Sequence, residues 1–274
     1  MDSVFELESY TFIDIVGADC EKFLKGQLSI NTNKLEVHKA KLAAFCNPKG
    51  RVVSLFHIHS TNEGVRLILP REIVDSTVAH LKKYIVFFKA EVKVAASLVL
   101  PLVASMEKRQ SEVDNSSVTI DGTGLSVITD GELSDTFSDK TLPQNQQWYW
   151  QLASNRIPWL TTESVEQFLP HNLNLPKLSA VDFNKGCFTG QEVIARMQYK
   201  GKLKQHMQLL QCESSLTFEP KIKLIQEDKN VGEVICSANK GQETLILALL
   251  KDSITKDKSF QLNIENSPIL SLVE

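Results

Sequence analysis

The sequence lacks the patterns that mark a membrane-spanning or exported chain. No run approaches the roughly 18 apolar residues that a bilayer crossing needs, and Met1–Glu6 does not lead from a basic into an apolar segment as a signal peptide does. The chain also lacks a strong excess of charge, because 30 Lys and Arg stand against 33 Asp and Glu, for a net charge of −3. We therefore expect a cytoplasmic protein with no membrane partner and no direct nucleic-acid binding.

Cysteine is scarce, and its spacing excludes a self-contained metal site. The five cysteines stand at positions 20, 46, 187, 212 and 236. No two of them form a C-x-x-C pair and their number is odd, which argues against a disulfide framework and against a zinc or iron–sulfur site within the chain. His57 and His59 share one face of a predicted strand, but no third ligand stands near them. We therefore predict no bound metal and a reducing compartment.

Several enzyme classes are excluded by missing motifs. The sequence has no phosphate-binding P-loop, no serine nucleophile elbow, no repeat of fixed period and no low-complexity tract. What remains is an ordinary globular composition, with 42% hydrophobic and 23% charged residues. A chain of 274 residues exceeds the usual size of one domain, so we expect two or three packed domains.

Strand and helix patterns alternate over the first two thirds of the chain, which indicates an α+β arrangement. We predict strands at 10–16, 41–46, 51–59, 66–69, 84–88, 92–95 and 98–104, and helices at 19–28, 70–83 and 146–154, with a polar linker at 107–115. After residue 202, short strand patterns separated by turn residues predict a small antiparallel β-barrel. We place an α+β region at 1–202 and a barrel domain at 203–274.

The stretch Phe183–Arg196 reads as a strand end, a tight turn and a helix. Thr189 and Glu192 fit a capping box, which predicts Thr189 as the N-cap of a helix over about 190–199. Gly201 fits a left-handed cap just beyond the end of this helix.

Cys187 stands just before this helix N-terminus, where the helix dipole favours an anion. Lys185 is two residues away, and both effects should lower the pKa of the thiol and favour a thiolate. Cys187 is therefore a candidate reactive residue. The alternative is a small buried hydrophobe, as most lone cysteines are, with Gly186 and Gly190 serving only the turn.

The run Lys-Gly-Cys-Phe-Thr-Gly-Gln-Glu, at 185–192, resembles the signature of the YgfZ family of folate-binding proteins. That family is related in fold to the aminomethyltransferase (T-protein) of the glycine cleavage system. Similar resemblances at 17–28, 49–51, 81–89 and 170–173 extend it over most of the chain. The resemblance implies interlocked α+β domains with a folate-sized pocket, followed by an antiparallel β-barrel. The region 105–145 is short compared with the family.

The resemblance also implies a function and a set of site residues. It implies tetrahydrofolate (or a derivative) as the cofactor, and a role in the assembly or repair of iron–sulfur enzymes, including those that modify tRNA. Cys187 would be a redox-sensitive or transfer-competent thiolate, tuned by Lys185. Tyr10 and Trp148 would flank the pterin, since a flat pterin stacks well on an aromatic face, although each could equally be a core aromatic. The remaining residues that would shape the site are Gln191, Glu192 and Arg196.

By this interpretation the protein is an accessory factor whose partners are folate and iron–sulfur client or assembly proteins. One alternative is a folate-dependent aminomethyl- or methyltransferase. Against it, Asn31 stands where we expect an Asp in many relatives and in the T-protein, and an amide cannot act as a carboxylate base. A second alternative is a non-catalytic adaptor that binds RNA or protein, which would need a basic or apolar surface patch. The basic run Lys200, Lys202 and Lys204 could meet RNA, but the negative net charge favours a solvated face for it.

Overall fold

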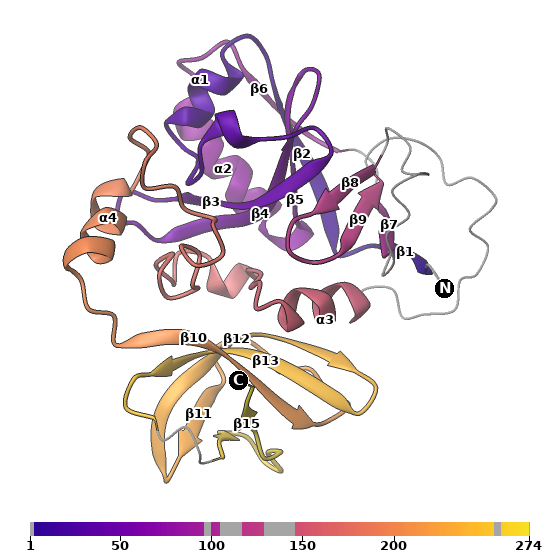
Figure 1. Cartoon of the computed structure of the whole chain (residues 1–274), viewed down its shortest axis with the longest axis vertical. Helices are drawn as coiled ribbons and strands as arrows, with labels where there is room; N and C mark the ends of the chain where they lie inside the picture. Colours follow the sequence, from indigo (N-terminus) through magenta and orange to yellow (C-terminus); the bar gives the residue numbers. More distant parts are fainter. Residues whose placement is uncertain (1–2, 96–99, 105–116, 129–145, 255–258, 274) are drawn as a thin grey trace.

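Two curled sheets organise the chain (Figure 1). The computed structural model describes residues 3–95, 100–104, 117–128, 146–254 and 259–273. Helix α3 (Gln146–Ser154) lies between the sheets, where it packs against two strands of the C-terminal sheet. The chain is therefore a mixed α+β protein with one helix at the junction of its two sheets.

The larger sheet has nine strands in the order β1-β7-β9-β8-β3-β4-β5-β2-β6. Neighbouring strands are antiparallel except β3 and β8, which run parallel. The strands are β1 (Ser3–Leu7), β2 (Tyr10–Val16), β3 (Lys39–Cys46), β4 (Val52–Ser60), β5 (Gly64–Pro70), β6 (Glu91–Val94), β7 (Leu100–Ala104), β8 (Ser117–Ile120) and β9 (Leu125–Ile128).

The first two strands show how the halves of this sheet interlock. Only Glu8 and Ser9 separate β1 from β2, yet β1 pairs with β7 whereas β2 pairs with β5 and β6. The N-terminal strand thus completes the half built from β7 to β9, while the following strands build the other half. The half built from β1 and β7 to β9 is therefore not contiguous in sequence, because the strands of the other half, β2 to β6, lie between its first strand and the rest.

Helices α1 (Cys20–Lys25) and α2 (Val74–Ile85) pack on this sheet through apolar side chains. Phe23 and Leu24 of α1 are buried, and the rings of Phe45 and Phe56 lie 4.6 Å apart in the core beneath α2. The remaining helices are η1 (Thr32–Lys34), η2 (Arg71–Ile73), η3 (Thr162–Ser164) and α4 (Gln191–Lys200). None of the helices in the described ranges combines the length and the apolar character that a membrane crossing requires.

The C-terminal sheet is antiparallel, in the order β14-β11-β12-β13-β10-β15. A bridge between Phe260 and Leu270 links its two edges, so the sheet curls around its own core. Strand β13 is buried on both faces, because Ile246 points into that core and Leu247 toward the main core near α3. The strands are β10 (Gln205–Glu213), β11 (Lys223–Gln226), β12 (Lys229–Lys240), β13 (Glu243–Lys251), β14 (Gln261–Leu262) and β15 (Ser271–Leu272).

Most predicted elements are confirmed, and two corrections are informative. The strand predicted at 84–88 is wrong, because Tyr84 and Ile85 end α2 and the next residues form a turn. The helix predicted at 19–28 ends at Lys25. Asp19 is its N-cap residue but makes no side-chain cap hydrogen bond, since its carboxylate accepts from the backbone N–H of Lys89. The linker predicted at 107–115 lies outside the described residues. The domain division after residue 202 stays a prediction.

Two buried histidines predict an acid-sensitive fold. Burial lowers the pKa of both His57 and His80 to about 4. Between about pH 6.5 and 4 the unfolded chain takes up protons that the folded state excludes, so the free energy of unfolding falls by about 1.4 kcal/mol per pH unit for each histidine. We predict that the urea concentration at the unfolding midpoint decreases as the pH is lowered from about 7 to 5, and that this decrease is smaller in His57→Gln. An unchanged slope in the variant would contradict the prediction.

Candidate functional site

Cys187 is the one exposed cysteine of the five, all of which lie in the described ranges. It stands in a loop, residues 185–190, that leads into α4. Cys20, Cys46, Cys212 and Cys236 are buried, and burial raises the pKa of each of these thiols. Only Cys187 therefore offers its sulfur to a partner or reagent in the folded protein.

Lys185 fixes the start of this loop. Its side chain is buried, and Nζ donates to the backbone carbonyl of Lys25 at 3.1 Å and to that of Leu28. The ammonium also lies 4.9 Å from the ring centroid of Phe188. Carbonyls at and just after a helix end are short of donors, and α1 ends at Lys25, so the lysine satisfies acceptors that burial would otherwise leave unpaired. Burial lowers the pKa of Lys185 to about 8.

Thr189 fixes the other end of the loop, and it is not the N-cap of α4. Its N–H donates to Gly26 O at 3.0 Å, and its hydroxyl lies 3.2 Å from Gln27 Oε1. The predicted capping box is therefore wrong, because the hydroxyl is used for a contact with the segment after α1. Gly190 is the N-cap, with no side-chain cap, while Gln191 Oε1 accepts from Phe188 N at 3.3 Å.

The other end of α4 also corrects a prediction. Gly201 has φ −86° and ψ 153°, so it is extended and not left-handed. A Cβ there would meet the sulfur of Met197 at 2.3 Å, which explains the glycine by close approach and not by backbone handedness.

Gly190 sets the position of α4 against the β3–β4 turn. Its φ is 83°, in the left-handed region, and a Cβ there would lie 2.5 Å from Asn47 O. The turn is closed by a hydrogen bond from Gly50 N to Asn47 O at 2.8 Å, and Asn47 Oδ1 accepts from Lys49 N and Arg51 N. The helix that follows Cys187 thus rests directly on a rigid turn.

We predict that Gly190→Ala destabilises the protein and that Gly186→Ala does not. A non-glycine residue in the left-handed region costs about 1–2 kcal/mol, and the contact with Asn47 O adds to that cost. Gly186 has open space at its Cβ position and serves as the matched control. Urea unfolding measures both, and equal stabilities of the two variants would disprove this account of Gly190.

We further predict that Lys185→Met changes the pH dependence of stability. The unfolded lysine has a pKa near 10.4, whereas that of the folded one is about 8. Between these values the unfolded chain holds more protons, so the free energy of unfolding of the parent rises with pH and the contribution is absent in the variant. The measurement is the difference in the free energy of unfolding between the parent and Lys185→Met, at several pH values between the two pKa values. A constant difference would show that Lys185 is not held in this environment.

Tyr10 and Trp148 meet in the core. Their ring centroids are 5.1 Å apart at 74°, an edge-to-face contact, and 2% and 0% of the two residues is exposed. Tyr149 joins the same cluster, 6.0 Å from Tyr10 and 4.7 Å from Trp159. Because the two rings touch, a flat ligand does not fit between them, and they can form only one wall of a pocket. Their contact with folate stays a prediction.

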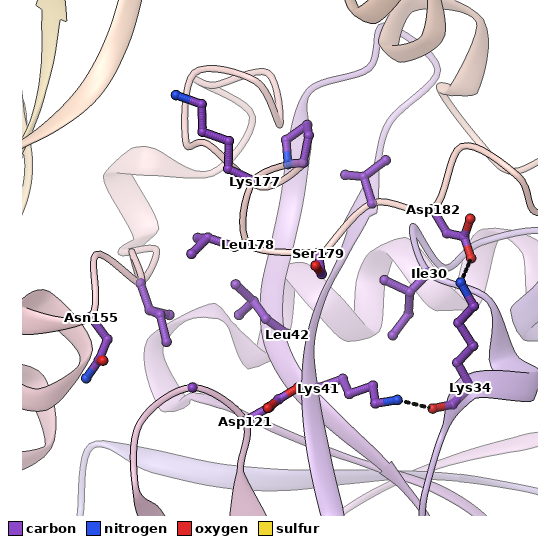
Figure 2. A pocket seen from close by; sticks show the side chains of 14 residues that line it. Ile30, Lys34, Lys41, Leu42, Asp121, Asn155, Lys177, Leu178, Ser179 and Asp182 are labelled. Carbon is purple, nitrogen blue, oxygen red and sulfur yellow. Dashed lines mark hydrogen bonds and ion pairs between the residues drawn. The ribbon is translucent and has the colours of Figure 1, made fainter.

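A cleft of about 510 Å³ opens beside β3. Figure 2 shows the Lys34–Asp182 pair at one end and Asn155 at the other, with Leu42 between them. Lys34 Nζ lies 2.7 Å from Asp182 Oδ2, and Lys41 Nζ donates to Lys34 O at 2.6 Å. The hydrogen bond from Lys34 lowers the pKa of Asp182. The lining residues are Ile30, Lys34, Lys41, Leu42, Asp121, Gly122, Asn155, Ile157, Pro176, Lys177, Leu178, Ser179, Val181 and Asp182.

One chain segment joins this cleft to Cys187. Residues 176–182 form a wall of the cleft, and Cys187 follows Asp182 by five residues. Asp182 Oδ1 accepts from Asn184 N at 2.9 Å, which fixes the turn between them. The cleft wall and the loop that presents the thiol are therefore parts of one continuous chain segment.

The structure brings together some of the predicted site residues and separates others. Lys185 and Cys187 share the loop and Gln191 begins the helix that follows it, whereas Tyr10 and Trp148 belong to the aromatic cluster near α3. The other two predicted residues, Glu192 and Arg196, are exposed on α4.

Sequence reasoning missed the cleft because its residues come from separate segments. The single local signal was Asp182, just before the motif. Asn31 borders the cleft residue Ile30, and its side-chain oxygen accepts from Asn33 N at 3.1 Å as the cap of η1. In the ranges given above, no three His, Cys, Asp or Glu side chains gather as metal ligands.

Proteins of the YgfZ type are similar to this chain over most of its length. The tRNA-modifying protein YgfZ of Aliivibrio fischeri is 28% identical over 281 residues, which cover 95% of this chain and 88% of that protein. Its counterpart in Vibrio atlanticus is 28% identical, covering 83% and 75%. An uncharacterized protein of Haemophilus influenzae is 27% identical, covering 98% and 96%. No family model matches the chain.

A solved structure confirms the fold. The glycine cleavage system aminomethyltransferase T from Bartonella henselae superimposes with a TM-score of 0.73 and 13% identity, covering all of this chain and 85% of that one. The α+β fold predicted from the motif, with its C-terminal antiparallel sheet, is therefore the aminomethyltransferase fold.

Proposed function

Starting from the homology of this chain to YgfZ proteins, we propose that it binds tetrahydrofolate or a derivative and supports enzymes that modify tRNA, iron–sulfur enzymes among them. The observation that carries the proposal is the similarity to proteins named tRNA-modifying protein YgfZ over 95% of the chain. The aminomethyltransferase fold is consistent with it. The protein would act as an accessory factor, with iron–sulfur client or assembly proteins as its partners.

The size and the lining of the cleft beside β3 support a folate as its ligand in this proposal. Its volume of about 510 Å³ falls within the range of small-molecule sites. Ile30, Leu42 and Ile157 offer apolar walls to a flat ring, and Lys177 offers positive charge to the carboxylates of a glutamyl tail. Lys41 also lines the cleft, but its Nζ is paired with Glu36 at 2.9 Å. Tetrahydrofolate, when bound, serves as a carrier of one-carbon groups.

In this proposal the Cys187 loop either responds to the presence of a ligand in the cleft or takes part in the chemistry of that ligand. The exposed Sγ is accessible to a client protein, which a redox or transfer step at this thiol requires. Lys185 would position the loop through Lys25 and Leu28, and Gln191 would hold its turn. Cys187→Ser should then lower the activity of dependent iron–sulfur enzymes without altering stability.

We predict micromolar binding of tetrahydrofolate in an anaerobic calorimetric titration. Lys177→Gln should weaken binding about tenfold, because a hydrogen bond to a charged group contributes about 1.5–3 kcal/mol. Lys49→Gln removes a lysine from the β3–β4 turn, outside the cleft, and serves as the matched control. No binding by the parent protein would refute the folate proposal, and equal loss in both variants would refute this cleft as the site.

A folate-dependent aminomethyltransferase is the alternative that the fold favours. Asn31 counts against it, because its amide already caps η1 and cannot take a proton as a carboxylate would. Transfer of a one-carbon unit to tetrahydrofolate from a lipoyl-bound amine donor would establish the alternative.

A further inference from the structure

The turn between α2 and β6 exposes two large apolar side chains side by side. Val86 is 72% and Phe87 is 82% exposed. The turn lies toward the end of the molecule that is remote from the C-terminal sheet (Figure 1). Two large apolar side chains next to each other are more than a single scattered residue, and the charges around them decide whether they suit a partner.

Two hydrogen bonds hold the backbone of this turn, and the turn keeps the Phe87 side chain exposed. Lys89 N donates to Asp19 Oδ2 at 2.8 Å, and Asp19 N donates to Lys89 O at 3.1 Å. Phe88, the next residue, packs inward with its centroid 5.4 Å from that of Phe23. The exposed ring is therefore preorganised for binding.

Three lysines flank Phe87 in the sequence. Lys82 and Lys83 occupy the last turn of α2, and Lys89 follows the turn. These three are exposed, and none of them forms an ion pair with any residue in the described part of the chain. Lys22 adds a fourth charge, with Nζ 6.0 Å from the Phe88 centroid.

Two of the three acidic residues near the turn are paired with lysines, and the third, Asp19, keeps its charge against the four lysines. Glu91 lies 4.0 Å from Lys93, Glu21 lies 2.9 Å from Lys25, and Asp19 accepts from a backbone N–H. The local charge is therefore positive, although the net charge of the whole chain is −3.

We propose that this basic aromatic turn, residues 82–89, binds a single-stranded segment of RNA. One unpaired base would stack on Phe87, and the neighbouring phosphates would lie beside the lysines, which is how proteins bind single strands without reading their sequence. The proposal goes beyond folate binding and revises the expectation of no nucleic-acid contact, because a net charge averages over surfaces of opposite sign. It rests on the proposed function only in the choice of tRNA as the probe.

A membrane surface would use the same charges but needs more apolar area. Even one myristoyl chain gives only marginal membrane binding, and Val86 and Phe87 together offer fewer carbons than that chain. One stacked base and three or four phosphate contacts are the number of interactions expected of a weak site for single-stranded nucleic acid. The balance of one aromatic ring and several lysines therefore favours RNA.

The test is fluorescence anisotropy with an unmodified tRNA transcript and a short single-stranded RNA, at about 50 to 200 mM salt. Phe87→Ala should weaken binding about 5- to 150-fold at every salt concentration, because it removes stacking and no charge. The triple variant Lys82→Gln, Lys83→Gln, Lys89→Gln should lower the slope of log affinity against log salt by about 2. The matched control neutralises the other basic run, Lys200, Lys202 and Lys204, and should bind like the parent.

Each other outcome overturns the proposal. Unchanged affinity in Phe87→Ala would mean that the turn contributes charge but no stacking. Loss of binding in the matched control would place the RNA at Lys200, Lys202 and Lys204 instead. If the parent binds no RNA but sediments with vesicles of phosphatidylcholine and phosphatidylglycerol, and Phe87→Ala does not, the turn is a membrane contact. Folate titration of the same preparation keeps this result separate from the proposed function, because no variant here touches the cleft.

Discussion

The buried ammonium of Lys185 is the interaction on which the arrangement of the site depends. A charge in the interior is costly unless polar groups surround it, and here the carbonyls of Lys25 and Leu28 at the end of α1 do so. This contact ties a loop late in the chain to its first helix, about 160 residues earlier. Thr189 and Gly190 complete the attachment to the segment after α1 and to the β3–β4 turn. The loop is thereby fixed at both ends while the thiol of Cys187 between them faces solvent.

The same attachment connects the loop to the cleft. The wall formed by residues 176–182 precedes the anchor directly, and the pair between Lys34 and Asp182 links that wall to η1. A ligand in the cleft and a partner at Cys187 would therefore act on one continuous, well-supported segment. The aromatic cluster of Tyr10 and Trp148 has a different place, since it packs near α3 at the junction with the C-terminal sheet. The cluster contributes to the core. If a ligand contacts it, the two touching rings form only one wall of the ligand's pocket.

Local pattern predicted much of this structure, and tertiary contacts explain where it failed. The helix at 146–154 and the strand at 10–16 were predicted to the residue, because their periodicity and propensity agree. The spacing of Thr189 to Glu192 predicts Thr189 as an N-cap. Its hydroxyl instead donates to Gln27 Oε1, a partner that no local rule reveals. The apolar run at 84–88 reads as a strand, but the first two residues complete α2. The cleft could not be foreseen, since residues from separate segments line it, and the family resemblance supplied the fold that assembles them.

The central claim is that the cleft and Cys187 form one functional unit, and the alkylation rate of Cys187 tests it most directly. Because the other four cysteines are buried, iodoacetamide labelling of the native protein reports on this thiol alone. We predict that saturating tetrahydrofolate changes the rate in the parent protein, and that Lys177→Gln needs about ten times more ligand for the same change. An identical rate with and without ligand, in a protein that calorimetry shows to be saturated, would contradict the account.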